Sequence, residues 1–422
     1  MKIAIVGSGI SGLTAAHHLH KTHDIQVFEA GAHIGGHTNT RDVTLPDGTH
    51  WAVDTGFIVF NHQTYPNFLK LLGDIGVEAQ ATTMSFSVNN RATGVEFSSE
   101  GAAGLFAQRR NLFRPSFYRM LSDVLSFRKA MNELVESGDQ SLTLGEFFRQ
   151  GRYSQAFWEE FLVPMGAAIW SSPDGYMEDF PATFFARFFF NHRFLEPKLQ
   201  PQWYVIKGGS RSYVEKLVVP FRDRIRLDCP VASVTRGPGG VTIRTAGGET
   251  EHYDKLIMAC HSDQTLRLLD DASADESRIL GAFPYQKNVA VLHTDIGIMP
   301  ESRRAWASWN HRVSRDGGPV SVTYDMTRLQ GLDASARFLV TLNDTEHIRD
   351  EHVIETINYA HPLFGCASAA AQKEHGVING VNHTYFCGAY WRYGFHEDGV
   401  VSAMNAIAPI LDQSDREGVG AA

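Results

Sequence analysis

The strongest constraint on this chain is a glycine pattern close to its first residue. Gly7-Ser8-Gly9-Ile10-Ser11-Gly12 follows an apolar run, Lys2–Val6, that predicts a strand, and it precedes a predicted helix from Leu13 onward. A second predicted strand, Gln26–Phe28, leads directly to Glu29. This order is typical of a βαβ unit that binds a dinucleotide, because the glycines allow a tight turn, close approach of the pyrophosphate and close helix–strand packing. The helix N-terminus then faces the phosphates, and Glu29 can accept hydrogen bonds from ribose hydroxyls.

Further motifs narrow the expected dinucleotide to FAD. They are Gly35-Gly36-His37-Thr38, Val53-Asp54-Thr55-Gly56-Phe57, Val205–Ser210, Phe386–Ala389 and Glu397–Ala403. Together they resemble the flavin amine-oxidase and carotenoid-desaturase superfamily. That resemblance implies that a Gly-Gly-Arg segment wraps the FAD pyrophosphate and that a C-terminal glycine turn and helix meet the isoalloxazine ring. In this chain His37 stands where the family usually has Arg, so a titratable group replaces a fixed positive charge.

The resemblance extends over nearly the whole chain and also points to lipids. Tyr324–Gln330, Val340–Asn343 and Gly394–Gly399 are similar to a bacterial group of FAD-binding, amine-oxidase-like proteins. A similar domain forms the N-terminal part of plant cyclopropane fatty acid synthases. The resemblance therefore implies a lipid substrate, and it makes a lipid methyltransferase a candidate partner.

The resemblance also assigns the residues that contact FAD, with Val231 beside the adenine. They are Gly7, Ser8, Gly9, Ser11, Gly12, Glu29, Ala30, Gly35, Gly36, His37, Thr38, Gly56, Phe57, Ile58, Val231, Gly388, Gly399 and Val400. Asp54 is expected to order the turn at Gly56.

Composition excludes several other classes. The chain has 422 residues, of which 43% are hydrophobic and 20% charged, as in globular enzymes. Its net charge of −9 argues against nucleic-acid binding, because no positive field attracts phosphates. The four cysteines are far apart and form no Cys-x-x-Cys pair, so we expect no metal site and reduced thiols. Without a leader or a long apolar run, a cytoplasmic protein is expected, soluble or peripheral to the inner face of the membrane.

The order of the motifs predicts an α/β fold with a Rossmann-like, discontinuous FAD-binding domain. We assign residues 1–80, 205–280 and 383–422 to this domain, with strands Arg224–Leu227, Val241–Thr245, Leu256–Ala259 and Thr384–Cys387 and a helix from near Gly399. Residues 81–204 and 281–382 form an inserted α+β substrate domain. The first insertion reads as largely helical, and the second contains predicted strands at Asn288–His293, Val320–Tyr324 and Phe338–Leu342.

Three residues are candidates for catalysis. Related amine oxidases place a lysine beside flavin N5, and Lys287 lies near the corresponding strand. The alignment puts that lysine nearer Val289. The alternative to a catalytic role is that Lys287 is a solvated lysine at the end of a strand. In the family, an aromatic residue at about this position packs beside the substrate nitrogen in front of the flavin. His396 is the first candidate for this position, and Tyr393 and Phe395 are the others. An imidazole there can act as a general acid or base, or it can simply hydrogen-bond in the turn. Tyr390 begins the same aromatic segment.

Two apolar segments each allow two interpretations. Segment 105–130 contains six basic residues and one acidic residue, Asp123, between apolar residues. It predicts either an amphipathic helix docked on the core or a surface that lies on an anionic membrane. The phenylalanine-rich stretch Phe180–Phe194 is either core or the wall of a tunnel for an acyl chain.

These observations favour an FAD-dependent oxidoreductase that transfers hydride from a substrate C–H bond to flavin. A lipid acyl chain is the preferred substrate, and desaturation is the preferred reaction. The alternatives are oxidation of a small amine and a non-catalytic, flavin-binding partner of a lipid methyltransferase.

Overall fold

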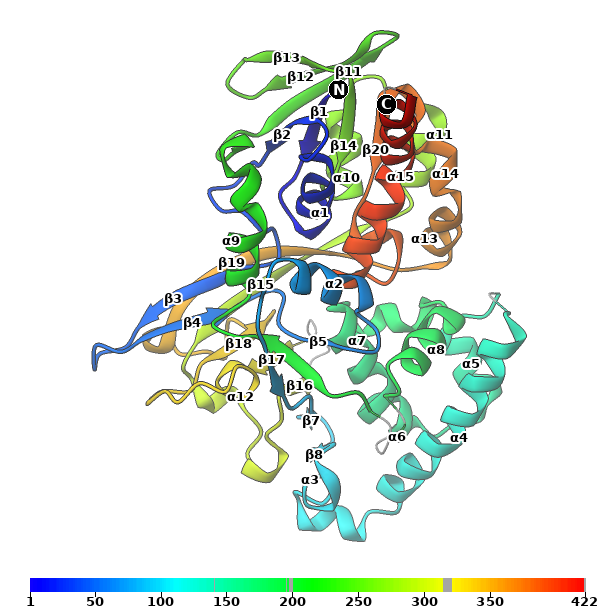
Figure 1. Ribbon diagram of the computed structural model, residues 1–422. Coiled ribbons are helices and arrows are strands. Elements are labelled where there is room, and N and C mark those ends of the chain that lie inside the picture. Colours follow the sequence, from blue (N-terminus) through cyan, green and yellow to red (C-terminus); the bar gives the residue numbers. More distant parts are fainter. Residues whose placement is uncertain (140, 195, 197–199, 314–320, 421–422) are drawn as a thin grey trace.

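The computed structural model describes residues 1–139, 141–194, 196, 200–313 and 321–420. The chain forms two stacked lobes (Figure 1). The upper lobe in Figure 1 contains a parallel sheet and both labelled chain ends, whereas the lower lobe contains a large mixed sheet and most of the helices between residues 101 and 191. Several strands and loops pass between the lobes, so neither lobe is one continuous piece of chain.

The upper lobe is built on a five-stranded parallel sheet with the order β10-β2-β1-β14-β20. These strands are β1 (Lys2–Val6), β2 (Asp24–Phe28), β10 (Ile225–Arg226), β14 (Lys255–Met258) and β20 (Thr384–Phe386). They come from three distant parts of the chain, as predicted for a discontinuous domain. Helices α1 (Ile10–Leu19) and α15 (His396–Gly420) pack against each other beside this sheet. The carboxyl ends of the strands therefore meet two helix N-termini.

Both helices begin earlier than predicted. Helix α1 begins at Ile10 rather than Leu13, and α15 begins at His396 rather than near Gly399. In each case a glycine lies within the first helical turn, where the missing side chain permits close packing rather than ending the helix. The sequence interpretation had placed these glycines in the preceding turns.

Smaller elements surround the parallel sheet. One is an antiparallel sheet of β11 (Val231–Gly237), β12 (Gly240–Thr245) and β13 (Thr250–Tyr253). Another is a hairpin of β3 (Thr40–Thr44) and β4 (His50–Asp54), and a third is a sheet in the order β5 (Phe60–Asn61), β9 (Trp203–Ile206) and β6 (Ala79–Thr82). The helices are α2 (Pro66–Asp74), α9 (Arg211–Val218), α10 (Ser262–Leu268) and α11 (Ala274–Leu280).

The lower lobe is centred on a seven-stranded sheet with the order β19-β15-β18-β17-β16-β7-β8. Its strands are β7 (Phe86–Asn90), β8 (Val95–Ser98), β15 (Tyr285–His293), β16 (Trp309–Val313), β17 (Ser321–Asp325), β18 (Leu339–Leu342) and β19 (Val353–Pro362). Three of them match the strands predicted in the second insertion, except that Val320 lies outside the described residues. The first insertion is largely helical, as predicted, but it also contains β7 and β8. These strands were missed because their side chains are buried on both faces and give no alternating pattern.

The helical part of the lower lobe consists of α3 (Gly101–Leu105), α4 (Pro115–Ser137), α5 (Leu144–Gln150), α6 (Gln155–Phe157), α7 (Val163–Trp170) and α8 (Ala182–Asn191). Helix α4 packs on α8. Phe180, Phe185 and Phe189 are buried between these helices, which makes this part of the phenylalanine stretch core.

One predicted domain boundary needs correction. Helices α13 (Cys366–Ala371) and α14 (His375–Ile378) fall in the segment 281–382 that was assigned to the substrate domain. They pack on α11 in the upper lobe, and their Ala371 and Ile378 share a core with β14 and β20. The second insertion therefore ends near residue 365.

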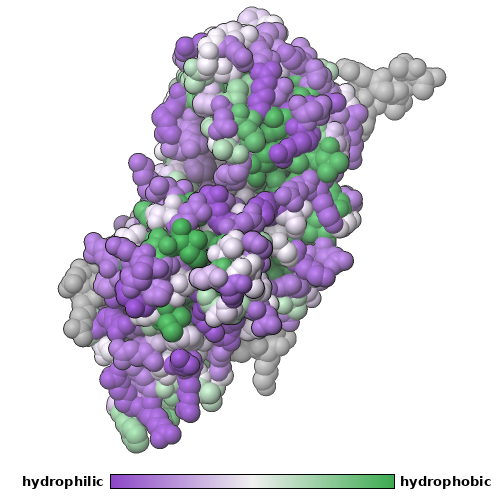
Figure 2. All heavy atoms as spheres, turned by 90° about the vertical axis from the view of Figure 1, so that its left-hand side faces the viewer, coloured by the Kyte–Doolittle hydropathy of each residue, from purple (hydrophilic) through white to green (hydrophobic). Residues whose placement is uncertain are grey.

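The surface is mainly polar on the face shown in Figure 2, where hydrophobic residues gather in separate patches. Within the described ranges, no helix combines the length and the apolar character needed to cross a bilayer.

Candidate cofactor and substrate site

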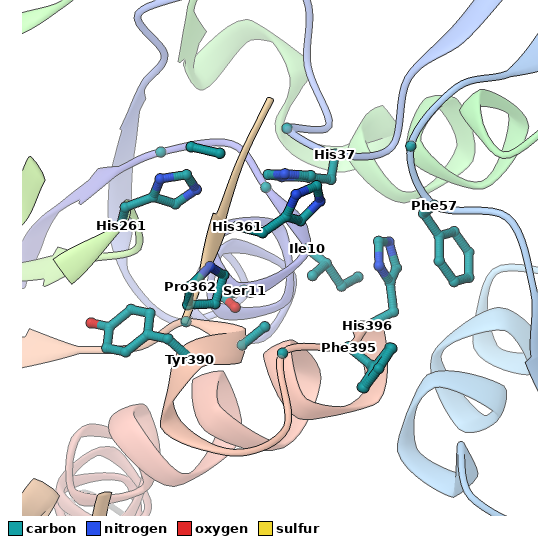
Figure 3. A pocket seen from close by; sticks show the side chains of 18 of the residues that line it. Ile10, Ser11, His37, Phe57, His261, His361, Pro362, Tyr390, Phe395 and His396 are labelled. Atoms are coloured by element: carbon teal, nitrogen blue, oxygen red, sulfur yellow. The ribbon is translucent and has the colours of Figure 1, made fainter. Parts of the chain in front are cut away.

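One cavity of about 610 Å³ extends from the carboxyl ends of β1 and β2 into the lower lobe. Its walls come from both lobes, and a view into it shows His37, His261 and His361 toward one side and His396 next to Phe57 on the other (Figure 3). Ligand sites in open α/β sheets lie at this end of the strands, so its position fits a dinucleotide.

The glycine loop forms the cavity wall at the N-terminus of α1. Gly7 has a φ of +105°, and a side chain there would strike the backbone of Ala259. A Cβ on Gly12 would lie 2.0 Å from the Gly7 carbonyl oxygen, whereas a Cβ on Gly9 would meet no atom within 4 Å. Gly7 and Gly12 are therefore required by packing. Gly9 instead keeps open the space in front of the helix N-terminus, where phosphates bind.

Glu29 directly follows β2 and faces the same loop. Its carboxylate accepts hydrogen bonds from the Ser8 amide at 3.0 Å, the Ser8 hydroxyl at 2.5 Å and the Gly31 amide at 2.8 Å. Ala30 and Val231 line the cavity beside it. This end of the cavity has the polar and apolar groups needed for a ribose and an adenine.

The segment Gly35-Gly36-His37 lies against the glycine loop. Gly35 forms a bridge to Gly9, and both Gly35 and Gly36 have positive φ angles that favour glycine. This arrangement holds the imidazole of His37 at the cavity wall, beside the N-terminus of α1.

Three histidines gather at this wall. The ring of His37 lies 5.2 Å from that of His361 and 5.9 Å from that of His261, and it stacks on Tyr359. Burial, together with the two neighbouring imidazoles, holds the pKa of His37 well below its usual value. Burial lowers the pKa of His361 to about 4 and also lowers that of His261. The cluster is therefore uncharged at neutral pH in this structure.

A chain of amide hydrogen bonds fixes the protonation of His361. The backbone amide of Val289 donates to Asn343 Oδ1 at 2.9 Å, so Asn343 Nδ2 donates to Asn288 Oδ1 at 2.6 Å. Asn288 Nδ2 must then donate to His361 Nδ1, which lies 2.7 Å away. The neutral ring consequently carries its proton on Nε2.

His396 occupies the first turn of α15 and lines the cavity. Its Nε2 lies 2.9 Å from Thr38 Oγ1 and 3.1 Å from the Tyr213 hydroxyl, and its ring stacks on Phe57. Burial lowers the pKa of His396 to about 3. The ring is therefore neutral, and it connects α15 to the segments around residues 38, 57 and 213.

The other two catalytic candidates differ in position. Tyr390 lines the cavity, and its buried hydroxyl has no hydrogen-bond partner among the described residues. Burial raises the pKa of Tyr390 well above its usual value, so the hydroxyl keeps its proton. Lys287 is exposed on β15 and does not line the cavity, because alternation along the strand turns its side chain outward. This position corresponds to the solvated strand-end lysine and does not support a catalytic role.

Most residues expected to contact FAD line the cavity, but four lie behind its wall. These four are Gly12, Thr38, Gly399 and Val400. The Thr38 hydroxyl holds Tyr213 and His396. Gly399 accepts a hydrogen bond from Ser11 Oγ at 3.0 Å and so joins α15 to α1, and Val400 belongs to the core of the upper lobe.

Asp54 does not line the cavity either. Its carboxylate accepts hydrogen bonds from the hydroxyls of Thr40 and Ser210 and from the Ser210 amide. Burial raises the pKa of Asp54 to about 6. It therefore fixes the Lys207–Ser210 turn against β3 and β4, and it does not act on a ligand directly.

The far end of the cavity is an aromatic chamber whose walls come from both lobes. It is formed by Val59, Tyr65, Met84, Ile169, Trp170, Phe188, His192, Phe194, Trp203, Trp309 and Tyr324. Both nitrogens of His192 are hydrogen-bonded, to Phe188 and Thr64, and burial lowers its pKa to about 4. Among the described residues that line the whole cavity, the only Asp, Glu, Lys or Arg side chains are Glu29 and Arg267, and neither is in the chamber.

Two of the three clustered histidines and most of the chamber were missed by sequence reasoning, although Phe188 and Phe194 line the chamber and belong to the Phe180–Phe194 stretch that was expected to be core or a tunnel wall. His261 directly follows the β14–Ala259–Cys260 segment, so its place after a strand of the parallel sheet was a usable signal. The tryptophans gave a weaker signal: Trp170, Trp203 and Trp309 are far apart in sequence and are brought together only by the fold.

The family of the chain follows from a match to a family model. The model for flavin containing amine oxidoreductases matches residues 10–408, so the chain belongs to this family. The protein is thus an FAD-containing oxidoreductase. No curated protein sequence matches the chain.

Solved structures share the fold over nearly their whole length. Cyclohexylamine oxidase from Brevibacterium oxydans IH-35A is 16% identical, with a TM-score of 0.72 and coverage of 98% of this chain and 99% of that chain. A CLA-producing fatty acid isomerase from P. acnes is 14% identical, with a TM-score of 0.71 and coverage of 96% and 98%. Putrescine oxidase bound to putrescine is 15% identical, with a TM-score of 0.68 and coverage of 98% and 99%.

The residues of the cavity fit FAD. The open space in front of Gly9 and the α1 N-terminus suits the pyrophosphate, and Glu29 suits a ribose. His37 Nε2 is buried without a hydrogen-bond partner in the described part of the chain, which leaves one ring nitrogen of the cluster unsatisfied beside this space. Gly388 and the first turn of α15 would hold the isoalloxazine end.

Proposed function

We propose that the protein oxidises a lipid acyl chain and leaves a carbon–carbon double bond. The observation that carries this proposal is the aromatic chamber, which continues from the cofactor end of the same cavity and contains no formally charged side chain among its described residues. An apolar chain gains free energy by leaving water for such a site, at about 25 cal/mol per Å² of buried surface. A cationic polyamine would lose its hydration there without finding a carboxylate.

Two resemblances support the same substrate class. One structural neighbour is described as a fatty acid isomerase, and the sequence resembles the N-terminal domain of plant cyclopropane fatty acid synthases. The resemblance to the synthase domain also suggests that a lipid methyltransferase supplies the acyl chain that this protein oxidises.

The chemistry requires the loss of two hydrogens from adjacent carbons, one as hydride and one as a proton. With FAD bound, the flavin would supply the hydride acceptor, and dioxygen or a quinone would take up the two electrons together with the proton, which gives hydrogen peroxide or a quinol. The protein must hold the acyl chain against the cofactor and exclude water. Trp170, Phe188 and Trp203 do this by forming the chamber wall.

We assign His396 a positioning role in this reaction. A group with a pKa of about 3 is a weak general base at neutral pH, because proton affinity and catalytic efficiency fall together. Its contacts with Thr38, Tyr213 and Phe57 instead orient the first turn of α15, on which the isoalloxazine end depends.

The proposal is tested with purified holoprotein under anaerobic conditions. Phospholipid or free fatty acid should bleach the oxidised flavin absorbance, and mass spectrometry should show acyl chains lighter by two hydrogens. Double-bond migration without bleaching would replace oxidation by isomerisation. Bleaching by amines but not by lipids would establish amine oxidation instead. A flavin that neither class reduces, together with co-purification of a lipid methyltransferase, would indicate a non-catalytic partner.

A further inference from the structure

Four large apolar side chains are exposed within a short stretch of the lower lobe. The stretch comprises the 3-10 helix η1 (Arg109–Phe113) and the first half of α4. The exposed fractions are 86% for Phe113, 68% for Leu125, 47% for Tyr118 and 43% for Leu112. We call the exposed side of residues 109–129 the η1–α4 surface. Apolar groups gathered in this way mark a site of interaction, because water contact with them is unfavourable.

Helix α4 has apolar residues on two opposite sides. Phe117, Met120 and Phe127 are buried against the rest of the lobe, as an ordinary docked helix requires. Tyr118 and Leu125 are seven residues apart and therefore share the outer side. Packing on the core explains the apolar residues on the inner side of α4, but it does not explain Tyr118 and Leu125 on the outer side.

The same surface is positively charged on an acidic protein. Arg109, Arg110 and Lys129 are exposed, and 61% of the Arg119 side chain is accessible. Asp123, the acidic residue of this stretch, is buried and paired with Arg119 at 3.1 Å. Lys129 lies 3.9 Å from the exposed Glu133. The whole chain carries a net charge of −9, so the local excess of basic groups contrasts with the rest of the molecule.

We propose that the η1–α4 surface docks on an anionic lipid bilayer. Phe113 and Leu112 enter the interface, and the arginines and Lys129 lie among the anionic head groups. Apolar side chains at the tip with basic groups around them complement such a membrane in both hydrophobicity and charge. This inference concerns location and goes beyond the reaction proposed above.

A row of aromatic side chains connects the inner side of α4 to the aromatic chamber. On the inner side of α4, the ring of Phe127 lies 6.4 Å from that of Phe185, which in turn lies 5.8 Å from that of Trp170. Trp170 lines the chamber. The helix proposed to dock on the bilayer is therefore linked by aromatic packing to the site proposed for the acyl chain.

The test is co-sedimentation of the holoprotein with phosphatidylcholine vesicles that either lack or contain phosphatidylglycerol. We expect binding to the phosphatidylglycerol vesicles, and we expect added salt to weaken it. Replacing Phe113 and Leu112 together by serine should weaken binding about ten-fold or more. Arg109→Gln and Lys129→Gln should each weaken it about five-fold. Val219→Ser, which removes an apolar side chain that is 72% exposed in the upper lobe, is the matched control and should bind like the wild type.

Each contrary result overturns the proposal. Absence of binding, equal binding to both vesicles, or equal loss in the Val219→Ser control would do so. Analytical ultracentrifugation distinguishes a second copy of the chain, because a dimer that separates when Phe113 is replaced would show that this surface binds itself. Since vesicle binding is measured without turnover, its failure leaves the proposed reaction untouched.

Discussion

The imidazole of His396 stacks on the ring of Phe57, with ring centroids 3.5 Å apart and an angle of 13° between the planes. Phe57 lies in the loop after β4, whereas His396 begins the last helix of the chain. The contact therefore joins the segments around residues 57 and 396. The sequence motifs predicted only that both segments contact the same FAD. Several testable consequences concern these and neighbouring residues.

Replacing His396 by Gln should change how stability depends on pH. Burial lowers the folded-state pKa of His396 to about 3, whereas an unfolded histidine titrates near pH 6.5. Below that pH the unfolded state binds an extra proton, so the wild type loses stability relative to the variant as the pH falls. The difference between the two unfolding free energies should shift by about 2 kcal/mol between roughly pH 7.5 and pH 5. Urea unfolding at several pH values measures it, with the exposed His252→Gln as the control.

The glycine loop offers a matched pair of variants. Gly12→Ala places a Cβ 2.0 Å from the Gly7 carbonyl oxygen, so both stability and FAD content should fall. Gly9→Ala meets no protein atom within 4 Å, and its backbone φ of −69° suits alanine. It should fold normally, with a melting temperature close to that of the wild type, but bind FAD poorly. Equal FAD affinity in the Gly9 variant would place the pyrophosphate elsewhere.

Replacing His37 by Arg should remove a pH dependence of FAD binding. The cluster is neutral because the pKa values of His37, His261 and His361 are lowered. The nearby charged side chains of α10 are Asp263, which raises the pKa of His261, and Arg267, which lowers it. An anionic pyrophosphate beside the cluster would raise the imidazole pKa values. FAD binding should then take up protons, and affinity should rise as the pH falls, by up to about ten-fold per pH unit for each proton. Fluorescence titration of the apoprotein should show a flatter profile for His37→Arg.

The size of the chamber should set the acyl chain length. Met84 is a half-buried loop residue that lines the chamber. Met84→Trp should shorten the accepted chain while leaving the flavin spectrum unchanged, because Met84 is remote from the glycine loop in the cavity. Competition between short and long fatty acids, followed by product mass spectrometry, measures the shift. An unchanged preference would argue against the chamber as the acyl site.

Replacing Lys287 by Met should have little effect on catalysis. Its side chain is exposed and outside the cavity, so Lys287→Met should leave the rate of flavin reduction within about two-fold of the wild type, in line with the small effects of most surface substitutions. Stopped-flow absorbance measures this rate. A large loss would mean that β15 changes its exposure when substrate binds.

The cofactor end of the site was predictable from sequence because each of its parts has a local signature. Gly7, Gly9 and Glu29 carry their spacing within one βαβ unit, and Gly388 follows a recognisable strand. The chamber was not predictable, because Trp170, Trp203 and Trp309 approach one another only through the packing of two lobes. Strands β7 and β8 were missed for a related reason, since strands buried on both faces lose the alternation that identifies them.

Strand β20 and the first turn of α15 are among the last parts of the chain, yet they complete the edge of the parallel sheet and the wall of the cavity. Ser11 near the beginning of the chain bonds to Gly399, and Glu397 accepts hydrogen bonds from the amides of Asn67 and Phe68 at the start of α2. During synthesis, the cavity therefore acquires all its walls only after the segments around Ser11 and Gly399, which are 388 residues apart, have both been made. A chain that stops before His396 lacks this wall, so we expect it to take up no cofactor.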